Sequence, residues 1–163
     1  IKEREKFKSN AMDLRLLVVD DNEADRTLFK YYLKTASRNL TVFEAASAEE
    51  GLNLIKADNH YDCVFLDYML PDMDGISLLR RVYDENKDLG PFPVVILTGQ
   101  GSESVAIDAI RYGAQDYLIK DNISKDTLQI ALAKARQVFD LKKTATSQNR
   151  FLSGPAKCKP SAA

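Results

Sequence analysis

Apolar and polar residues follow one another along the chain in blocks whose lengths are typical of strands and helices. Short apolar runs of four to six residues recur, and longer segments with apolar residues at every third or fourth position separate them. The pattern therefore predicts five β-strands that alternate with five α-helices. The strands are expected at 14–19, 40–45, 63–66, 93–97 and 115–119.

Strands and helices that alternate in this way form a parallel sheet with right-handed crossovers and helices on both faces. The runs LLVV, CVFL and VVIL are apolar without a break, which is typical of central strands buried on both sides. The run at 40–45 alternates and fits a place near an edge. We therefore expect an α/β, flavodoxin-like, doubly wound five-stranded parallel sheet in the order 2-1-3-4-5, with five helices.

The expected helices have recognisable ends and buried faces. Asn22 is the expected N-cap of the first helix, Ser47 to Glu50 form a capping box, Gly113 is a C-cap, and Ser124 caps the last helix. The core-facing residues expected on the five helices are Ala24, Leu28, Tyr32 and Ala36; Ala48, Leu52 and Ile55; Ile76, Leu79, Val82 and Tyr83; Val105, Ala106, Ala109 and Ile110; and Leu128, Ala131, Leu132, Ala135, Val138 and Phe139.

Both ends of the chain depart from this pattern. Residues 1–12 are charged and lack core positions, and Ser9-Asn10-Ala11 resembles a remnant of expression cloning, so Met12 is the expected native start. Residues 143–163 are small and polar, with Gly154-Pro155, and are expected to be a C-terminal tail or truncated linker. The last helix can run past Lys142. The folded domain is expected at 13–142.

Composition excludes several classes of protein. A formal net charge of -1 on a mixed surface provides no positive patch, so this domain is not expected to bind nucleic acid. No apolar run reaches membrane-spanning length and no signal peptide is evident, so we expect a cytoplasmic protein without a membrane segment. Cys63 and Cys158 lie in very different settings, which argues against a disulfide framework. One histidine, His60, is too few for a zinc cluster.

Chemically matched residues follow four of the predicted strands. Asp20 and Asp21 follow the first strand, Asp67 the third, Thr98 the fourth and Lys120 the fifth. In the order 2-1-3-4-5 the winding reverses between strands 1 and 3, where ligands bind at the carboxyl ends. Three carboxylates placed there raise one another's pKa unless a cation compensates. An oxygen-only set of this kind suits Mg²⁺.

Together these groups can support phosphoryl transfer. Asp67 is a candidate nucleophile, Thr98 offers a hydroxyl and Lys120 an ammonium, and with a divalent ion they stabilise the charge of a transferring phosphoryl group. The product would be an aspartyl phosphate on Asp67. Taken singly, each residue has an ordinary explanation: Asp67 begins a turn, the acidic pair Asp20-Asp21 starts a helix, and Lys120 lies on the surface. Their joint placement favours the functional interpretation.

These residues resemble those of the response-regulator receiver domain of two-component signalling (CheY-like). The resemblance covers about residues 13–142 and places six roles in the family's order along the chain. The matching positions are the acidic pair Asp20-Asp21, the phospho-acceptor Asp67 with its loop to Gly75, the switch hydroxyl Thr98, the switch aromatic Tyr117 and the lysine Lys120.

The resemblance implies a metal site and a switch rather than an enzyme. Asp21, Asp67 and the backbone carbonyl of Met69 would bind Mg²⁺ directly, and Asp20 would act through water. The domain would assist its own phosphorylation and dephosphorylation. The phosphoryl donor would be a histidine kinase, a histidine phosphotransfer protein or a small acyl phosphate.

Phosphorylation of Asp67, by the same resemblance, would move Thr98 and Lys120 and draw Tyr117 inward. The face formed by the fourth helix, the fifth strand and the last helix would then change shape. That face would bind a partner, form a homodimer or act on a downstream output domain. Tyr117 could also be an ordinary strand aromatic.

One departure from the family concerns the residue after Lys120. The family often has a proline there, in a cis peptide, whereas this chain has Asp121. A cis bond to another residue costs about 2.5–4 kcal/mol, so we expect either a trans bond with a shifted loop or a strained cis bond.

Three alternatives remain at this stage. A phosphatase of the haloacid-dehalogenase type would need an acid two positions after its nucleophile, where this chain has Met69. An interaction module could keep the fold without being phosphorylated. The chain is expected to be the amino-terminal receiver of a larger signalling protein, and the alternative is that it is a single-domain receiver.

Overall fold

Five parallel strands form one sheet in the order β2-β1-β3-β4-β5, which confirms the predicted topology. The computed structural model describes residues 13–36, 39–58, 60–86, 91–99 and 103–158, so the expectation for residues 1–12 lies outside the described part. The strands are β1 (Leu14–Val19), β2 (Leu40–Ala45), β3 (Cys63–Asp67), β4 (Val94–Thr98) and β5 (Asp116–Ile119).

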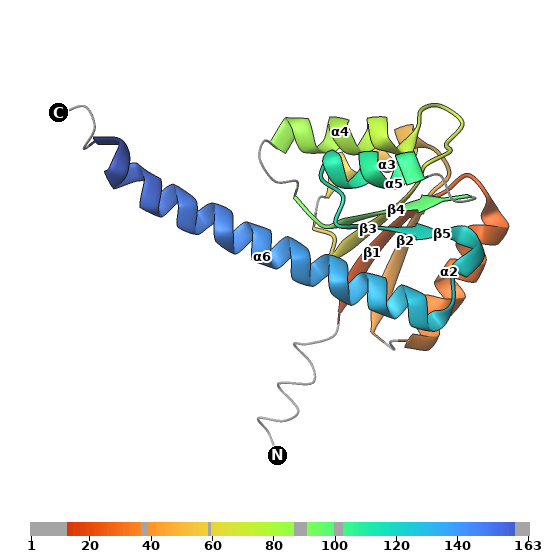
Figure 1. Cartoon of the computed structure of the whole chain (residues 1–163). Coiled ribbons are helices and arrows are strands. Elements are labelled where there is room, and N and C mark those ends of the chain that lie inside the picture. Colours follow the sequence, from red (N-terminus) through yellow and green to blue (C-terminus); the bar gives the residue numbers. More distant parts are fainter. Residues whose placement is uncertain (1–12, 37–38, 59, 87–90, 100–102, 159–163) are drawn as a thin grey trace, which may run out of the picture.

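Helices cover both faces of the sheet, with α3, α4 and α5 on one side and α2 and α6 on the other (Figure 1). A single 3₁₀ turn, η1 (Lys120–Asn122), joins β5 to the last helix. The helices are α2 (Glu23–Ala36), α3 (Ala48–Ala57), α4 (Gly75–Asn86), α5 (Glu103–Arg111) and α6 (Lys125–Cys158). Within the described ranges, no helix has both the length and the apolar character needed to cross a membrane.

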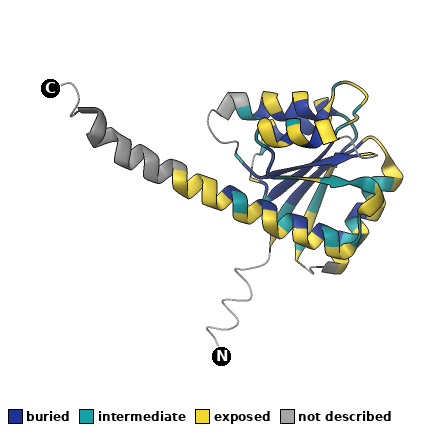
Figure 2. Cartoon of the chain, in the orientation of Figure 1, coloured by how far each residue is buried: buried dark blue, intermediate teal, exposed yellow. Residues whose placement is uncertain are grey.

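Alternate residues of the central strands face the two helical layers. In β1, Leu17 and Val19 join the cluster under α3, α4 and α5, whereas Leu16 and Val18 join the cluster under α2 and α6. Strands β3 and β4 are buried along their whole length (Figure 2). The unbroken apolar runs are therefore central strands, as predicted, and β2 lies at an edge.

The core-facing side of α2 differs from the prediction. Phe29 and Leu33 are 3% and 1% exposed, whereas Leu28 is 48% exposed. The Phe29 ring packs edge-on against Phe65 with ring centroids 4.8 Å apart. The prediction for Leu28 was wrong because two adjacent apolar residues allow two faces, and the larger ring takes the buried one. Ala24, one turn before Leu28, is exposed too, so that prediction was also wrong. The prediction that Ile110 of α5 faces the core was also wrong, since Ile110 is exposed and Ala109 beside it is buried.

The predicted helix ends are present. The Ser47 side chain accepts a hydrogen bond from the backbone N–H of Glu50 at the start of α3, and Glu50 accepts one from Ala46. Gly113, just after α5, has a φ of 109°, and a Cβ there would lie 2.7 Å from the Tyr83 ring. No L-residue would fit this position without strain. The side chains of Asn22 and Ser124 accept N-cap bonds as expected.

Helix α6 is longer than predicted. It extends past Lys142, as expected, and continues to Cys158 through a segment that was expected to be a tail or linker. Residues 144–153 contain neither glycine nor proline, so the backbone can continue the helix there. Its second half projects beyond the sheet (Figure 1). The domain boundary at 142 stays a prediction, and residues 159–163 lie outside the described part.

Candidate functional site

Carboxylates and a lysine meet at the carboxyl end of the sheet. Asp20 follows β1, Asp67 is the last residue of β3, and Lys120 follows β5. Strands β1 and β3 are neighbours with Val19 opposite Leu66, so the residues that follow are brought together. The strand order, rather than any local sequence, therefore assembles the site.

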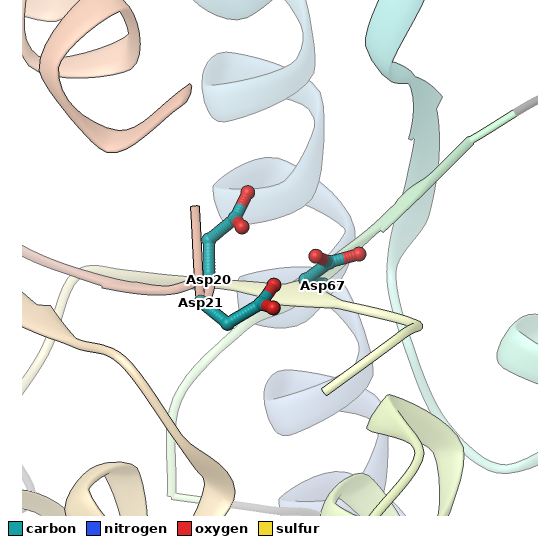
Figure 3. Close-up of side chains that lie close together, drawn as sticks. All are labelled: Asp20, Asp21 and Asp67. Atoms are coloured by element: carbon teal, nitrogen blue, oxygen red, sulfur yellow. The ribbon is translucent and has the colours of Figure 1, made fainter. Parts of the chain in front are cut away.

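Three carboxylates converge there, those of Asp20, Asp21 and Asp67 (Figure 3). One oxygen from each can be chosen so that all lie within 4.8 Å of one another. Asp20 and Asp67 are only 2% and 3% exposed, whereas Asp21 is exposed. The set contains only oxygen atoms and opens to solvent on the Asp21 side, which suits a hard divalent cation.

Lys120 supplies positive charge to this cluster. Its Nζ lies 2.7 Å from Oδ2 of Asp20 and 2.9 Å from Oδ2 of Asp67. Burial opposes the charge of Lys120, but these hydrogen bonds and ion pairs outweigh burial and raise its pKa above the usual value. The bond from Lys120 to Asp121 is trans, as are all peptide bonds in the described ranges.

The pKa of the Asp67 carboxyl group bears directly on its possible function. Burial raises its pKa to about 6, the hydrogen bond from Lys120 opposes that rise, and the charge of Asp20 adds to it. At neutral pH the carboxylate is mainly ionised yet poorly solvated. Such a group is available as a nucleophile and gains from a nearby cation.

Backbone groups fix the two buried carboxylates in place. The N–H of Met69 donates to Oδ1 of Asp67 at 3.2 Å, and the N–H of Asn22 donates to Oδ1 of Asp20 at 2.9 Å. The Arg26 guanidinium donates to the backbone carbonyl of Asp20 at 2.6 Å. In both aspartates the other oxygen, Oδ2, contacts Lys120. The carboxylates of Asp20 and Asp67 are thus each held by a backbone N–H on one oxygen and by Lys120 on the other.

The loop after Asp67 folds tightly against it. The N–H of Gly75 donates to the carbonyl of Tyr68 at 2.8 Å, and a Cβ at Gly75 would overlap the carbonyl oxygen of Asp67. Asp72 accepts hydrogen bonds of 2.9 Å from the N–H groups of Ala48 and Glu49 and so ties the loop to α3. The role of Asp72 is not evident from the sequence, because its partners lie more than twenty residues away.

The two expected switch residues have different surroundings. Thr98 is buried at the end of β4, and its hydroxyl donates to the carbonyl of Gly99 at 3.3 Å. Tyr117 of β5 is 40% exposed, so its ring lies outside the core. The side chain of Met69 is exposed, and its backbone N–H contacts the site through the bond to Asp67.

Asp25 is a further acid at this site that the sequence analysis did not single out. It lies in the first turn of α2, and its Oδ2 is 3.1 Å from Nζ of Lys120. Its side chain is 44% exposed, in contrast to the buried acids. The signal in the sequence is its place in the first turn of the helix that directly follows Asp20 and Asp21, which keeps it near the carboxyl end of β1.

Residues 16–133 match the family model described as "Response regulator receiver domain". A curated relative is the transcriptional regulatory protein SrrA of Staphylococcus aureus (strain NCTC 8325 / PS 47), with 34% identity over 109 residues. The alignment covers 67% of this chain and 42% of that protein. The chain therefore spans less than half the length of the curated relatives that it matches.

Solved structures show the same arrangement. A response regulator receiver domain protein from Clostridium thermocellum has a TM-score of 0.67 and 29% identity, covering 81% of this chain and 98% of that chain. The signal receiver domain of a putative LuxO repressor protein from Vibrio parahaemolyticus has a TM-score of 0.70 and 27% identity, covering 82% and 98%. The similarity thus covers about four fifths of this chain and nearly the whole of each of those two domains.

Proposed function

Because the chain belongs to the response regulator receiver domain family, we propose that it accepts a phosphoryl group on Asp67 and acts as a signalling switch. The donor is a phosphohistidine of a histidine kinase or phosphotransfer protein. The observation that carries this proposal is the convergence of Asp20, Asp21 and Asp67 within 4.8 Å, with the Lys120 ammonium 2.9 Å from Asp67.

The proposed reaction is a direct phosphoryl transfer. A carboxylate oxygen of Asp67 bonds to phosphorus while the bond from phosphorus to the histidine nitrogen breaks, and the imidazole keeps the electron pair. A pKa of about 6 leaves the carboxylate mainly ionised at neutral pH, as an attacking group must be. Lys120 lies close enough to pair with the oxygens of the incoming phosphoryl group.

The donor set fits Mg²⁺. Asp20, Asp21, Asp25 and Asp67 carry more negative charge than the single ammonium of Lys120 balances, so a divalent cation can neutralise part of the excess. We propose that Asp21, Asp67 and the backbone carbonyl of Met69 hold the ion directly and that Asp20 contributes through water. When bound, Mg²⁺ offsets the charge of the phosphoryl oxygens.

The proposed switch runs from Asp67 to the face made of α5, β5 and α6. A phosphoryl group adds charge and acceptor oxygens, which favours movement of Lys120 and of the Thr98 hydroxyl toward it. The Thr98 hydroxyl bonds the carbonyl of the adjacent Gly99, and Tyr117 lies outside the core, which supports movement of both. The altered face then binds a partner, forms a homodimer or acts on an output domain.

An output domain is favoured by the relatives. The SrrA proteins of Staphylococcus aureus are named transcriptional regulatory proteins, and the alignment covers 42% of their length. We propose that the receiver controls such a domain and that it does not itself contact nucleic acid.

Incubation with Mg²⁺ and a small acyl phosphate, followed by intact-mass measurement, tests the phosphoryl-acceptor role. The wild-type protein should gain the mass of one phosphoryl group, and Asp67→Asn should gain none while keeping its circular dichroism spectrum. Asp72→Asn is the matched control, since Asp72 contacts α3 rather than the cluster. Undiminished labelling of Asp67→Asn would contradict the assignment, and an unlabelled wild type would favour a non-phosphorylated interaction module.

A further inference from the structure

The Lys120 ammonium has more acidic partners than a salt bridge requires. It contacts Oδ2 of Asp20 at 2.7 Å, Oδ2 of Asp67 at 2.9 Å and Oδ2 of Asp25 at 3.1 Å. An ammonium has three protons to donate, so these three carboxylates can engage all of its hydrogen-bonding capacity. Asp25 therefore binds the same ammonium, at the longest of the three distances.

The three partners differ in what else they do. Asp20 and Asp67 belong to the carboxylate cluster that suits a metal ion, whereas Asp25 does not. Asp25 also comes from a different element, the first turn of α2, where a negative charge is favoured by the helix dipole. It thus places a third negative charge on the α2 side of the ammonium, which the ammonium contacts at the same time as the other two acids.

The space around Lys120 permits such a displacement. A cavity is bordered by Lys120, Asp20 and Asp25, with Leu28 of α2 and Ile123, which follows η1, among its apolar walls. Its apolar walls can hold the methylene stem of Lys120 while the ammonium turns between acids.

We propose that Asp25 is a positioning residue that shares the Lys120 ammonium with Asp20 and Asp67 and thereby makes these two acids easier for a divalent cation to bind. The inference rests on the proposed function in one respect, since it takes the carboxylate cluster as the metal site. Without Asp25 the ammonium would bond only to Asp20 and Asp67, and Mg²⁺ would have to compete with it more strongly.

The test is the Mg²⁺ affinity of the unphosphorylated full chain, measured by isothermal titration calorimetry at neutral pH. Asp25→Asn should raise the dissociation constant about two- to fivefold, the range that partly exposed ion pairs cover. Asp25→Glu keeps the charge and should stay closer to the wild type than to Asp25→Asn. Because Asp25 is 44% exposed, both variants should fold, which circular dichroism checks.

Two comparisons separate positioning from a general loss of negative charge. Glu23→Gln removes an exposed carboxylate from the same helical turn, and Glu23 forms no ion pair with the described residues. It should change the affinity less than Asp25→Asn does. In a Lys120→Met background, Asp25→Asn should have no more effect than Glu23→Gln.

Equal shifts for Asp25→Asn and Glu23→Gln would overturn the proposal, as would an Asp25→Asn effect that persists undiminished without Lys120. A chain that binds no Mg²⁺ would overturn it too. A chain that binds Mg²⁺ with the expected pattern yet takes no phosphoryl group would contradict the proposed function and leave the role of Asp25 intact.

Discussion

The two ends of the central sheet both gather charged residues, but the balance of charge differs between them. At the carboxyl end, one ammonium on Lys120 lies among the carboxylates of Asp20, Asp25 and Asp67. Two of these acids are almost wholly buried. The cluster therefore holds excess negative charge where water solvates it poorly, which costs stability.

At the amino end the charges are matched. Arg15 of β1 pairs with Asp58 at 2.8 Å, and its guanidinium lies over the Phe43 ring, 4.9 Å from the centroid. Asp62 accepts a bond from the backbone N–H of Arg15 and lies 4.0 Å from Arg136 of α6. Two guanidinium groups thus face two carboxylates, all of them partly exposed.

The difference shows how to tell a functional cluster from a structural one. Balanced, partly exposed pairs join strands and helices and need nothing else. A buried cluster with excess negative charge lowers the stability of the fold. Its presence is explained when the site binds a cation or a reacting group that supplies the missing positive charge. Charge balance and burial, rather than the number of charged residues, identify the site here.

Loss of Lys120 should have the largest effect on stability. Lys120→Met leaves Asp20 and Asp67 buried without a positive partner and should lower the free energy of unfolding by about 3 kcal/mol at neutral pH. Urea unfolding measures the change. Mg²⁺ should recover much of it, because the ion replaces the missing charge.

The matched control is Lys134→Met, since Lys134 pairs with Asp116 at 3.7 Å in an exposed position on α6. That variant should change stability by about 0.5 kcal/mol or less, with or without Mg²⁺. If Lys120→Met and Lys134→Met had equal effects, the distinction between buried and exposed charge would fail.

Replacing Gly75 should destabilise the protein, because the backbone of the loop after Asp67 is tightly packed at this position. A Cβ in Gly75→Ala would overlap the carbonyl oxygen of Asp67, so the loop must shift, at a cost of about 2–3 kcal/mol. Gly99→Ala is the control, because its Cβ would meet no atom within 4 Å. Thermal unfolding measures both variants. Equal stability of the two would show that the acceptor loop is not tightly packed.

Much of the fold was predictable from the chain because local patterns agree with the global structure. Unbroken apolar runs identified β1, β3 and β4 as central strands, and Ser47 and Gly113 marked helix ends. The α2 face was not predictable, because Leu28 and Phe29 are adjacent and only packing against Phe65 decides between them.

The site was predictable in outline only. Asp20, Asp67 and Lys120 could be paired in advance, because parallel strands bring their carboxyl ends to one edge. Asp25 was missed since its partner lies far along the sequence and its exposure gives no apolar signal. Asp72 was missed for the same reason.

Neutralising Asp67 should stabilise the protein. Since burial raises its pKa, charging this group costs free energy, and Asp67→Asn should gain about 1–2 kcal/mol at neutral pH. The folded state holds this proton more tightly than the unfolded state, so the wild type should lose stability as the pH rises from about 3.8 to about 6. In Asp67→Asn, this part of the pH-dependent loss of stability should be absent. Urea unfolding across this range checks it.

Ionisation of Asp58, at the amino end of the sheet, should affect stability in the opposite direction to that of Asp67. The backbone hydrogen bond from His60 and the other groups around it lower the pKa of Asp58, so its contribution is present above the unfolded value and is lost as the pH falls. Asp58→Asn should therefore weaken the fold at neutral pH. A stabilising Asp58→Asn, or a destabilising Asp67→Asn, would break the contrast between the two ends.

Arg15 should have a smaller effect than Lys120, although it makes several contacts. Its ion pair with Asp58 is partly exposed on both sides, and a methionine keeps the apolar stem over Phe43. Arg15→Met should therefore cost about 1 kcal/mol or less by urea unfolding. Mg²⁺ should not change that cost, because the amino end holds no excess charge. A loss as large as that of Lys120→Met, or one recovered by Mg²⁺, would show that charge balance does not separate the two ends.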